Sequence, residues 1–471
     1  MKVLFVSVFL LCALSAYAQG ANDPVILDNA DSLKSETINS QPVRHFMGHV
    51  KFHQGNVTIT CNDALHNLTT NIAQLNGDVV LTQDTMVITA PHAVYDANTH
   101  LATGDGGIRL TDHVIVLTAS NGTYDMGTHI ATFHDHVKIV NDTAVITSND
   151  LTYNRITEIS FATKNVKIVD SSGIITCDRL TNDRIHQRSY CAGNVCARSR
   201  TDRSLVFGDT LFHDSQRNYS HVPVNPLLVH IDSTMKEKTD SLGGRTRYPA
   251  YDTTFIISKT MDAVRGDSER YDAYDSVRIL RPDMSARGNE AHFYRVIQPT
   301  SHTPSPDIMT LSKNPIVWYN DTQLTGDSIT LFLKNNQLQK LISDRNAFGI
   351  TQSDSVYPLR FNQLAGARLT MYFHNDSLDN VRVEKNAISV YFGFDSTKPK
   401  GANRMSGDTI VITMKQGKPD QVYTLGGGEG QYFPEKLVRK NEPDYRLTGF
   451  EWRDAEKPKR SNFHVPEQAA R

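Results

Sequence analysis

Two histidines that flank an aspartate are the first residues whose types and spacing could support chemistry. His134 and His136 lie on either side of Asp135, and alternate residues of a strand share one face, so both imidazoles could bind a metal ion. The 18 histidines are scattered through the sequence, and no third ligand is evident near this pair. We therefore expect no metal site and no cofactor.

Sequence motifs for catalysis or nucleotide binding are not recognisable. We find no GxSxG elbow, no HExxH motif and no P-loop, and no column of carboxylates that a polysaccharide-cleaving β-helix would need. The stretch Gly426-Gly427-Gly428-Glu429-Gly430 follows an expected strand but opens no helix, so we interpret it as a loop. We expect a protein that is not an enzyme and has no catalytic residues.

The charge balance bears on the partners of the chain. Its 49 Lys and Arg residues against 51 Asp and Glu residues give a formal net charge of −2, which supplies no basic surface for a nucleic acid backbone. We expect no nucleic acid partner. With 471 residues and 39% hydrophobic content, the chain can bury a large core and form two or three domains.

The N-terminal residues have the pattern of an export signal. Lys2 supplies the positive charge, Val3 to Ala13 form an apolar run, and Ala16-Tyr17-Ala18 is a small-x-small cleavage site. We predict a signal peptide over residues 1–18. No later stretch approaches the roughly twenty apolar residues of a transmembrane helix, so we expect export without a membrane span.

Four cysteines follow the signal peptide, at positions 61, 177, 191 and 196. They are too few for a disulfide-built scaffold of this size. Cys191 and Cys196 lack the CxxC spacing of a zinc site, and one local disulfide between them is left open.

An internal repeat of 29 residues organises the first half of the chain. Apolar residues recur at this period in three columns, and a column of threonines adjoins the third. The first column is Val50, Val79, Ile108, Val137, Val166 and Val195; the second is Phe52, Leu81, Leu110, Ile139 and Ile168; the third is Ile59, Ile88, Leu117, Ile146 and Ile175. Five repeats in register indicate a structural unit.

Each repeat has the pattern of two or three short strands. Apolar and polar residues alternate within it, as half-buried strands require, and Gly, Asn and Asp at its ends suit turns. One unit cannot bury its apolar face alone, so successive units must stack. We predict an all-β fold of two stacked repeat arrays, with no helix beyond about three turns.

A second array with longer units follows a Pro- and Gly-containing segment. Gly288, Gly326, Gly366 and Gly407 recur at intervals of 38 to 41 residues. The sequence suggests a signal peptide (1–18), an N-terminal extension (19–44), a first repeat domain (45–222), a linker (223–261), a second repeat domain (262–430) and an extended basic tail (431–471).

The alternation assigns a face to each column. The apolar columns point to the interior, whereas the column of Lys51, Arg109, Lys138 and Lys167 points outward. Aliphatic columns would also form the core of any closed β-stack, so only an accessible interior makes them a ligand site. The cationic column could contact lipid phosphates or an acidic partner, although a solvated charged face also explains it.

The repeat resembles the OstA-like proteins of lipopolysaccharide transport. The resemblance rests on Gly77-Asp78-Val79-Val80-Leu81-Thr82-Gln83-Asp84, Val87-Ile88-Thr89-Ala90, Ala93-Val94-Tyr95-Asp96 and Leu101-Ala102-Thr103-Gly104. It covers residues 45–222 well and residues 262–430 more loosely. It implies a twisted β-jellyroll, open along one side, whose apolar interior shields the acyl chains of lipid A.

The resemblance predicts a periplasmic protein that binds lipopolysaccharide, or bridges it toward the outer membrane. The apolar columns would then contact acyl chains. Partners would be other transport components or a second copy, joined by strand addition, which we expect around Arg44 to Gln54. The alternative is an exported adhesin or polysaccharide-binding scaffold, which should carry an outward aromatic ladder; Tyr95, Tyr124 and Tyr153 do align.

Overall fold

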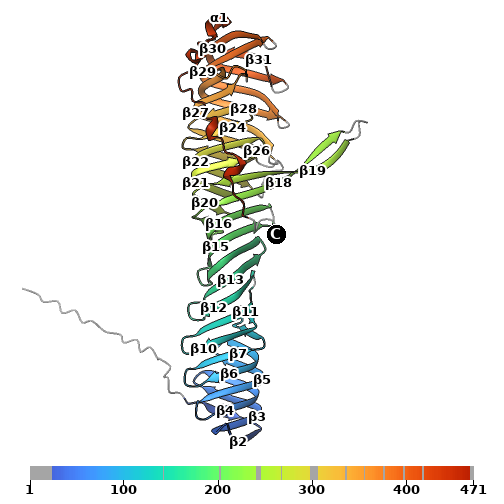
Figure 1. The fold of residues 1–471 in the computed structure, drawn as a ribbon, viewed down its shortest axis with the longest axis vertical. Coiled ribbons are helices and arrows are strands. Elements are labelled where there is room, and N and C mark those ends of the chain that lie inside the picture. The colour runs from blue at the N-terminus through green and yellow to red at the C-terminus, as the bar shows by residue number, and fades with distance from the viewer. Residues whose placement is uncertain are drawn as a thin grey trace, which may run out of the picture. The chain divides into compact units, whose positions relative to one another are not determined.

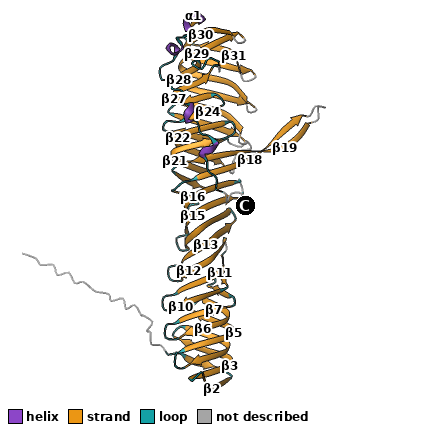
Figure 2. Cartoon of the chain, viewed as in Figure 1, coloured by secondary structure: helices purple, strands orange, loops and turns teal. Residues whose placement is uncertain are grey.

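The computed structural model of the chain is almost entirely β-structure. It describes residues 24–466 except residues 142, 201–202, 240–244, 267, 297–305, 335–336, 355, 375–376, 396–397 and 416–417. The expected signal peptide, residues 1–18, lies outside the described residues. Among these residues, helix occurs only in short pieces near the C-terminal end of the chain (Figure 2). The prediction of an all-β fold is confirmed, and no described helix is long and apolar enough to cross a membrane.

The chain divides into two compact units, which meet in sequence between Ile168 and Val169. Unit 1 contains twelve strands and most of a thirteenth (Figure 1). These are β1 (Ile26–Asn29), β2 (Ser32–Ile38), β3 (Gln41–Gln54), β4 (Val57–Asn67), β5 (Ile72–Gln83), β6 (Met86–Asp96), β7 (Leu101–Asp105), β8 (Ile108–Thr111), β9 (Val116–Ala119), β10 (Asn121–Asp125), β11 (Ile130–Val140), β12 (Ala144–Asn154) and β13 (Ile159–Asp170).

The long strands of unit 1 bend where their pairing register breaks. β5 pairs with β4 and β6 on both sides of such a break, which lies between Asn76 and Val79. Gly77 and Asp78 in this break have φ of 76° and 46°, a left-handed conformation that glycine adopts at low cost. The same break occurs in β3 and β11. Two successive residues with positive φ therefore form a corner between two half-strands.

The corners divide unit 1 into two facing arms, each a stack of antiparallel half-strands. Arm A contains residues 50–61, 79–90, 108–119, 137–140 and 144–148, and arm B contains residues 41–47, 63–76, 92–105, 121–134 and 150–154. Hairpin turns lie at the ends of both arms that are remote from the corners. We call the line along which these free ends face each other the seam.

Unit 2 repeats this arrangement with longer strands. Its strands are β14 (Gly173–Asp183), β15 (Arg188–Ser199), β16 (Ser204–Asp214), β17 (Tyr219–Val222), β18 (Leu227–Thr239), β19 (Arg245–Ile257), β20 (Thr260–Val264), β21 (Ser268–Leu280), β22 (Met284–Val296), β23 (Asp307–Ser312), β24 (Ile316–Tyr319), β25 (Thr322–Thr325), β26 (Ser328–Lys334), β27 (Gln337–Gln352), β28 (Phe361–His374), β29 (Ser377–Asp395), β30 (Lys398–Lys415), β31 (Lys418–Leu425) and β32 (Glu429–Pro434). β18 and β19 pair over their full length and extend to one side of unit 2 (Figure 1), in the region where the sequence suggested a linker.

Register breaks in β21, β27, β28 and β29 again separate two arms. Arm A of unit 2 includes residues 277–288, 316–325, 347–352, 361–366, 387–395 and 398–407, and arm B includes 290–296, 307–312, 328–334, 337–344, 368–374 and 377–384. A large apolar cluster that includes Ile279, Leu324, Leu331 and Met371 fills the space between them.

Residues 435–466, which we call the strap, lie over the outer face of arm A in unit 2. The strap contains helix α1 (Glu435–Val438) and three 3-10 helices (Glu442–Tyr445, Asp454–Glu456 and Arg460–Asn462). Its Val438 and Leu447 pack against Ile350 and Phe392, and its Phe463 packs in a cluster with Phe207.

Candidate functional site

The predicted interior columns face the space between the arms of the stack. Fourteen of the sixteen residues are buried, and Ile88 and Ile175 are half-buried. The second and third columns form one ladder, because their members pair across adjacent strands in the order Phe52, Ile59, Leu81, Ile88, Leu110, Leu117, Ile139 and Ile146. Whether these residues contact a ligand stays a prediction.

The cationic column lies on the opposite face. Lys51, Arg109, Lys138 and Lys167 are exposed. They alternate with the threonine column across the strands, as in the pairs Arg109–Thr118 and Lys138–Thr147. Arm A of unit 1 therefore has an apolar inner face and a polar, cationic outer face.

A pocket lies between the arms of unit 1. The inner row of arm B runs through Leu75, Ala93, Gly104, Gly122 and Phe133. Three consecutive small residues leave space opposite the aliphatic ladder of arm A. The resulting pocket encloses about 480 Å³ of empty space, part of which is open to solvent.

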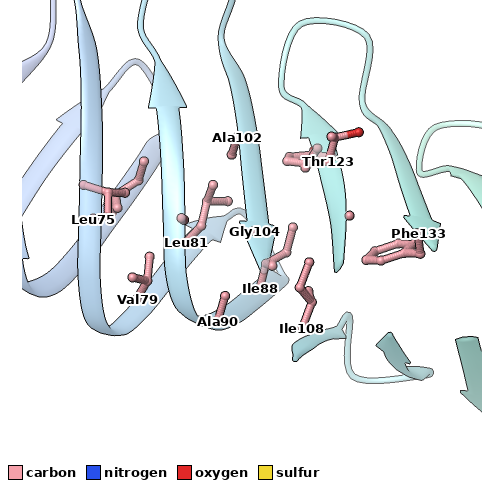
Figure 3. Close-up of a pocket in the computed structure, with 14 residues that line it drawn as sticks. Leu75, Val79, Leu81, Ile88, Ala90, Ala102, Gly104, Ile108, Thr123 and Phe133 are labelled. Atoms are coloured by element: carbon pink, nitrogen blue, oxygen red, sulfur yellow. The ribbon is translucent and has the colours of Figure 1, made fainter. Parts of the chain in front are cut away.

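The lining of this pocket is almost wholly apolar. From arm A it includes Leu81, Ile88 and Ile108, which Figure 3 shows around the same space as Phe133 of arm B. No charged residue is among its lining residues. Ile88 and Ala102 point inward but are only half-buried, because they border empty space. Such a site can hold a hydrocarbon chain, which gains about 0.8 kcal/mol per CH₂ removed from water.

Side-chain hydrogen bonds bridge the seam at intervals of 29 residues. The Tyr95 hydroxyl of arm B donates to Gln54 Oε1 of arm A, and the Tyr124 hydroxyl donates to Gln83 Oε1 over 2.5 Å. In the next repeat the Tyr153 hydroxyl lies 3.5 Å from Asp112 Oδ2. We call these three contacts the seam pairs.

The tyrosines of the seam pairs alternate with alanines along arm B. Tyr95, Tyr124 and Tyr153 are 1%, 3% and 4% exposed, so they form no outward aromatic ladder. Burial raises the pKa of Tyr95 and of Tyr124 to about 12 in each case. The neutral phenol is thus the favoured donor, and Tyr124 itself also lines the pocket.

An ion pair flanks the seam on the outside. Arg155 Nη1, in the turn after Tyr153, lies 3.0 Å from Asp84 Oδ2, in the turn after Gln83. It joins the free end of arm B to the free end of arm A, next to the Tyr124–Gln83 bond.

The candidate metal ligands do not gather into a site. His134 Nδ1 lies 2.8 Å from Asp150 Oδ1, whereas His136 Nδ1 lies 3.2 Å from Ser120 Oγ. Asp135 and His136 have φ of 60° and 55° and form a corner, which separates the two imidazoles. No group of three potential metal ligands occurs among the residues that the structure describes.

The four described cysteines are free and buried. Cys191 pairs with Leu180 in arm B, whereas Cys196, on the same strand, packs in the outer cluster with Phe207. Their side chains point to opposite faces, so the local disulfide that the sequence left open does not form. Cys191 instead contacts Cys177: their hydrogen bond lowers the pKa of Cys177, and it raises the pKa of Cys191 together with burial.

Sequence reasoning missed the small residues of arm B and the seam pairs. The seam pairs leave a signal, since Gln54 and Gln83, like Tyr95 and Tyr124, recur at the 29-residue period. Their pairing becomes visible only when the corners bring the two free ends together.

Residues 22–178 match the family described as OstA-like protein. This confirms the resemblance seen in the repeats, and the matched region contains the whole pocket and the seam pairs. No curated protein matches the chain.

Proposed function

We propose, from the OstA-like match over residues 22–178, that this chain is a non-catalytic carrier of lipopolysaccharide in the periplasm. Acyl chains of lipid A would occupy the pocket between the arms of unit 1. The observation that carries the proposal is this apolar pocket, which lies within the matched region and is bordered by half-buried aliphatic residues such as Ile88.

The outer face of unit 1 suits an anionic contact. Lys51, Arg109, Lys138 and Lys167 are exposed along one row, and a row of cations can attract the phosphates of a lipid headgroup or an acidic partner. In this proposal the cations assist the approach of the ligand, while the interior holds its hydrocarbon.

An exposed strand edge supports docking of a transport component or a second copy. β3, where we predicted strand addition around Arg44 to Gln54, pairs with β1, β2 and β4, so this location was wrong. The edge is formed by β1 and β2, whose Ile26, Leu27 and Leu33 are 47%, 42% and 55% exposed. Unpaired apolar edges invite an additional strand.

Photo-crosslinking tests the carrier function directly. A photoreactive residue at Ile88, inside the pocket, should capture lipopolysaccharide in cells or from purified micelles. The matched control is Thr89, the next residue of β6, which belongs to the outer row with Arg109 and should capture none. Equal labelling at both positions, or no labelling at either in folded protein, contradicts the proposal.

A further inference from the structure

We propose that the seam pairs form a lateral gate, through which an acyl chain enters the interior of unit 1 sideways. The inference rests on the proposed function, and it adds the route by which the ligand reaches the pocket. The alternative route is entry from an end of the stack, with the seam shut.

The position of the seam pairs supports this route. The Tyr124–Gln83 bond closes the seam directly beside the pocket, because Tyr124 is one of the lining residues. Tyr95–Gln54 and Tyr153–Asp112 flank it at one repeat on either side. The three pairs therefore span the stretch of seam that covers the pocket.

The chemistry of the pairs suits reversible opening. When the arms separate, a phenol and a carboxamide exchange their mutual hydrogen bond for bonds to water, so the net contribution of each bond to closure is small. The hydrogen bonds run between side chains, so separating the free ends breaks no strand pairing within either arm.

The seam of unit 2 is closed by an aromatic contact and is therefore harder to open. There Tyr319, at the free end of arm A, packs edge-on against Phe373 of arm B, with ring centroids 4.9 Å apart. Both rings belong to the large apolar cluster. Opening this seam would expose both rings to water, which the hydrophobic effect opposes. In unit 1 the aromatic contact between the arms, Phe52 with Tyr95, is wider, with ring centroids 6.3 Å apart.

A crosslink across the outside of the seam tests the gate without replacing a residue that lines the pocket. Asp84→Cys and Arg155→Cys replace the flanking ion pair, and a short bismaleimide then ties the two free ends together. The control lock, Asn71→Cys with Asn98→Cys, replaces a hydrogen bond of 3.0 Å between two turns of arm B, so it does not cross the seam. The native cysteines are buried, and the wild-type chain treated with the same reagent controls for them.

The readout is capture of lipopolysaccharide by the photoreactive residue at Ile88. With the gate held shut, we expect the capture rate to fall at least about tenfold, since the competent open population is removed; the control lock should leave it unchanged. Equal capture by both locked proteins overturns the gate but leaves the carrier function standing. Equal loss in both also overturns it, because the effect is then not specific to the seam.

Weakening the seam pairs provides a second, opposite test. Tyr95→Phe with Tyr124→Phe keeps the rings but removes both donors, and capture at Ile88 should become faster in protein with an unchanged circular dichroism spectrum. An unchanged or slower rate counts against the gate. No capture in any variant, including the unlocked chain, would mean that the carrier function itself is wrong.

Discussion

The inner rows of arm B differ in side-chain size between the two units. In unit 1, Ala93, Gly104 and Gly122 are successive cross-strand neighbours, whereas the row of unit 2 at the same distance from the corners contains Ile329, Ser343, Leu369 and Val383. The same bent-strand architecture therefore encloses a pocket in unit 1 and a filled core in unit 2. A repeat fold can change from scaffold to binding site through a few side chains of one row.

The outer face of arm A is polar and exposed in unit 1, but apolar and covered in unit 2. Unit 1 exposes the cationic column there, whereas unit 2 carries Phe207, Phe348 and other apolar residues on this face and covers them with the strap. Gln323 and Gln363 hold the strap by its backbone, since each amide both donates to a carbonyl and accepts from an N–H. Unit 2 is thus packed on both faces of arm A, and unit 1 on the inner face alone.

The largest loss of stability is expected when the ion pairs that anchor the strap to unit 2 are removed. Arg360, whose side chain is 0% exposed, pairs with Glu435 and Glu442 of the strap. Replacing both glutamates by glutamine leaves the guanidinium without a carboxylate, so we expect unit 2 to lose about 3–5 kcal/mol of stability. Both tryptophans, Trp318 and Trp452, lie in unit 2, so urea unfolding followed by tryptophan fluorescence measures this loss.

Glu456→Gln is the matched control on the same strap. Its carboxylate contacts Arg287 and Arg453 at the surface, and exposed pairs of this kind contribute at most about 1 kcal/mol. If this variant loses as much stability as the double variant, the buried anchor is not what holds the strap.

Truncating one inner residue in each unit sharpens the contrast between core and pocket. Leu331 of unit 2 is 1% exposed, and replacing it by alanine leaves a cavity in a packed core, at a cost of about 2–5 kcal/mol. Ile88→Ala in unit 1 enlarges a space that is already empty and should cost only about 1 kcal/mol. Hydrogen exchange of peptides from each unit measures both losses, and equal losses would mean that the pocket is as tightly packed as the core.

The sequence predicted the rows and their faces because a 29-residue period and an alternation of two are both local patterns. These two patterns place Leu110 on the inner face and Arg109 on the outer face. The packing of the strap could not be predicted. Arg360 binds glutamates that lie 75 and 82 residues later in the sequence, in a segment that does not contain the repeat. The pocket also escaped prediction, because Gly104 and Gly122 become meaningful only once they are known to be neighbours in one row.

The smallest expected effect concerns the seam at high pH. The pKa of Tyr95 and of Tyr124 is raised to about 12 by burial, above the usual value near 10 of an unfolded chain. The folded state therefore holds these protons more tightly, and its added stability is fully present below pH 10 and is lost as the pH rises from about 10 to 12. We expect unit 1 to show this loss in hydrogen exchange, and Tyr95→Phe with Tyr124→Phe to remove most of it. Unit 2 has tyrosines of its own with a raised pKa, Tyr219 at about 12 and Tyr274, so the comparison is between wild type and double variant within unit 1. If the double variant loses stability over the same pH range as the wild type, the seam tyrosines are not the groups that titrate.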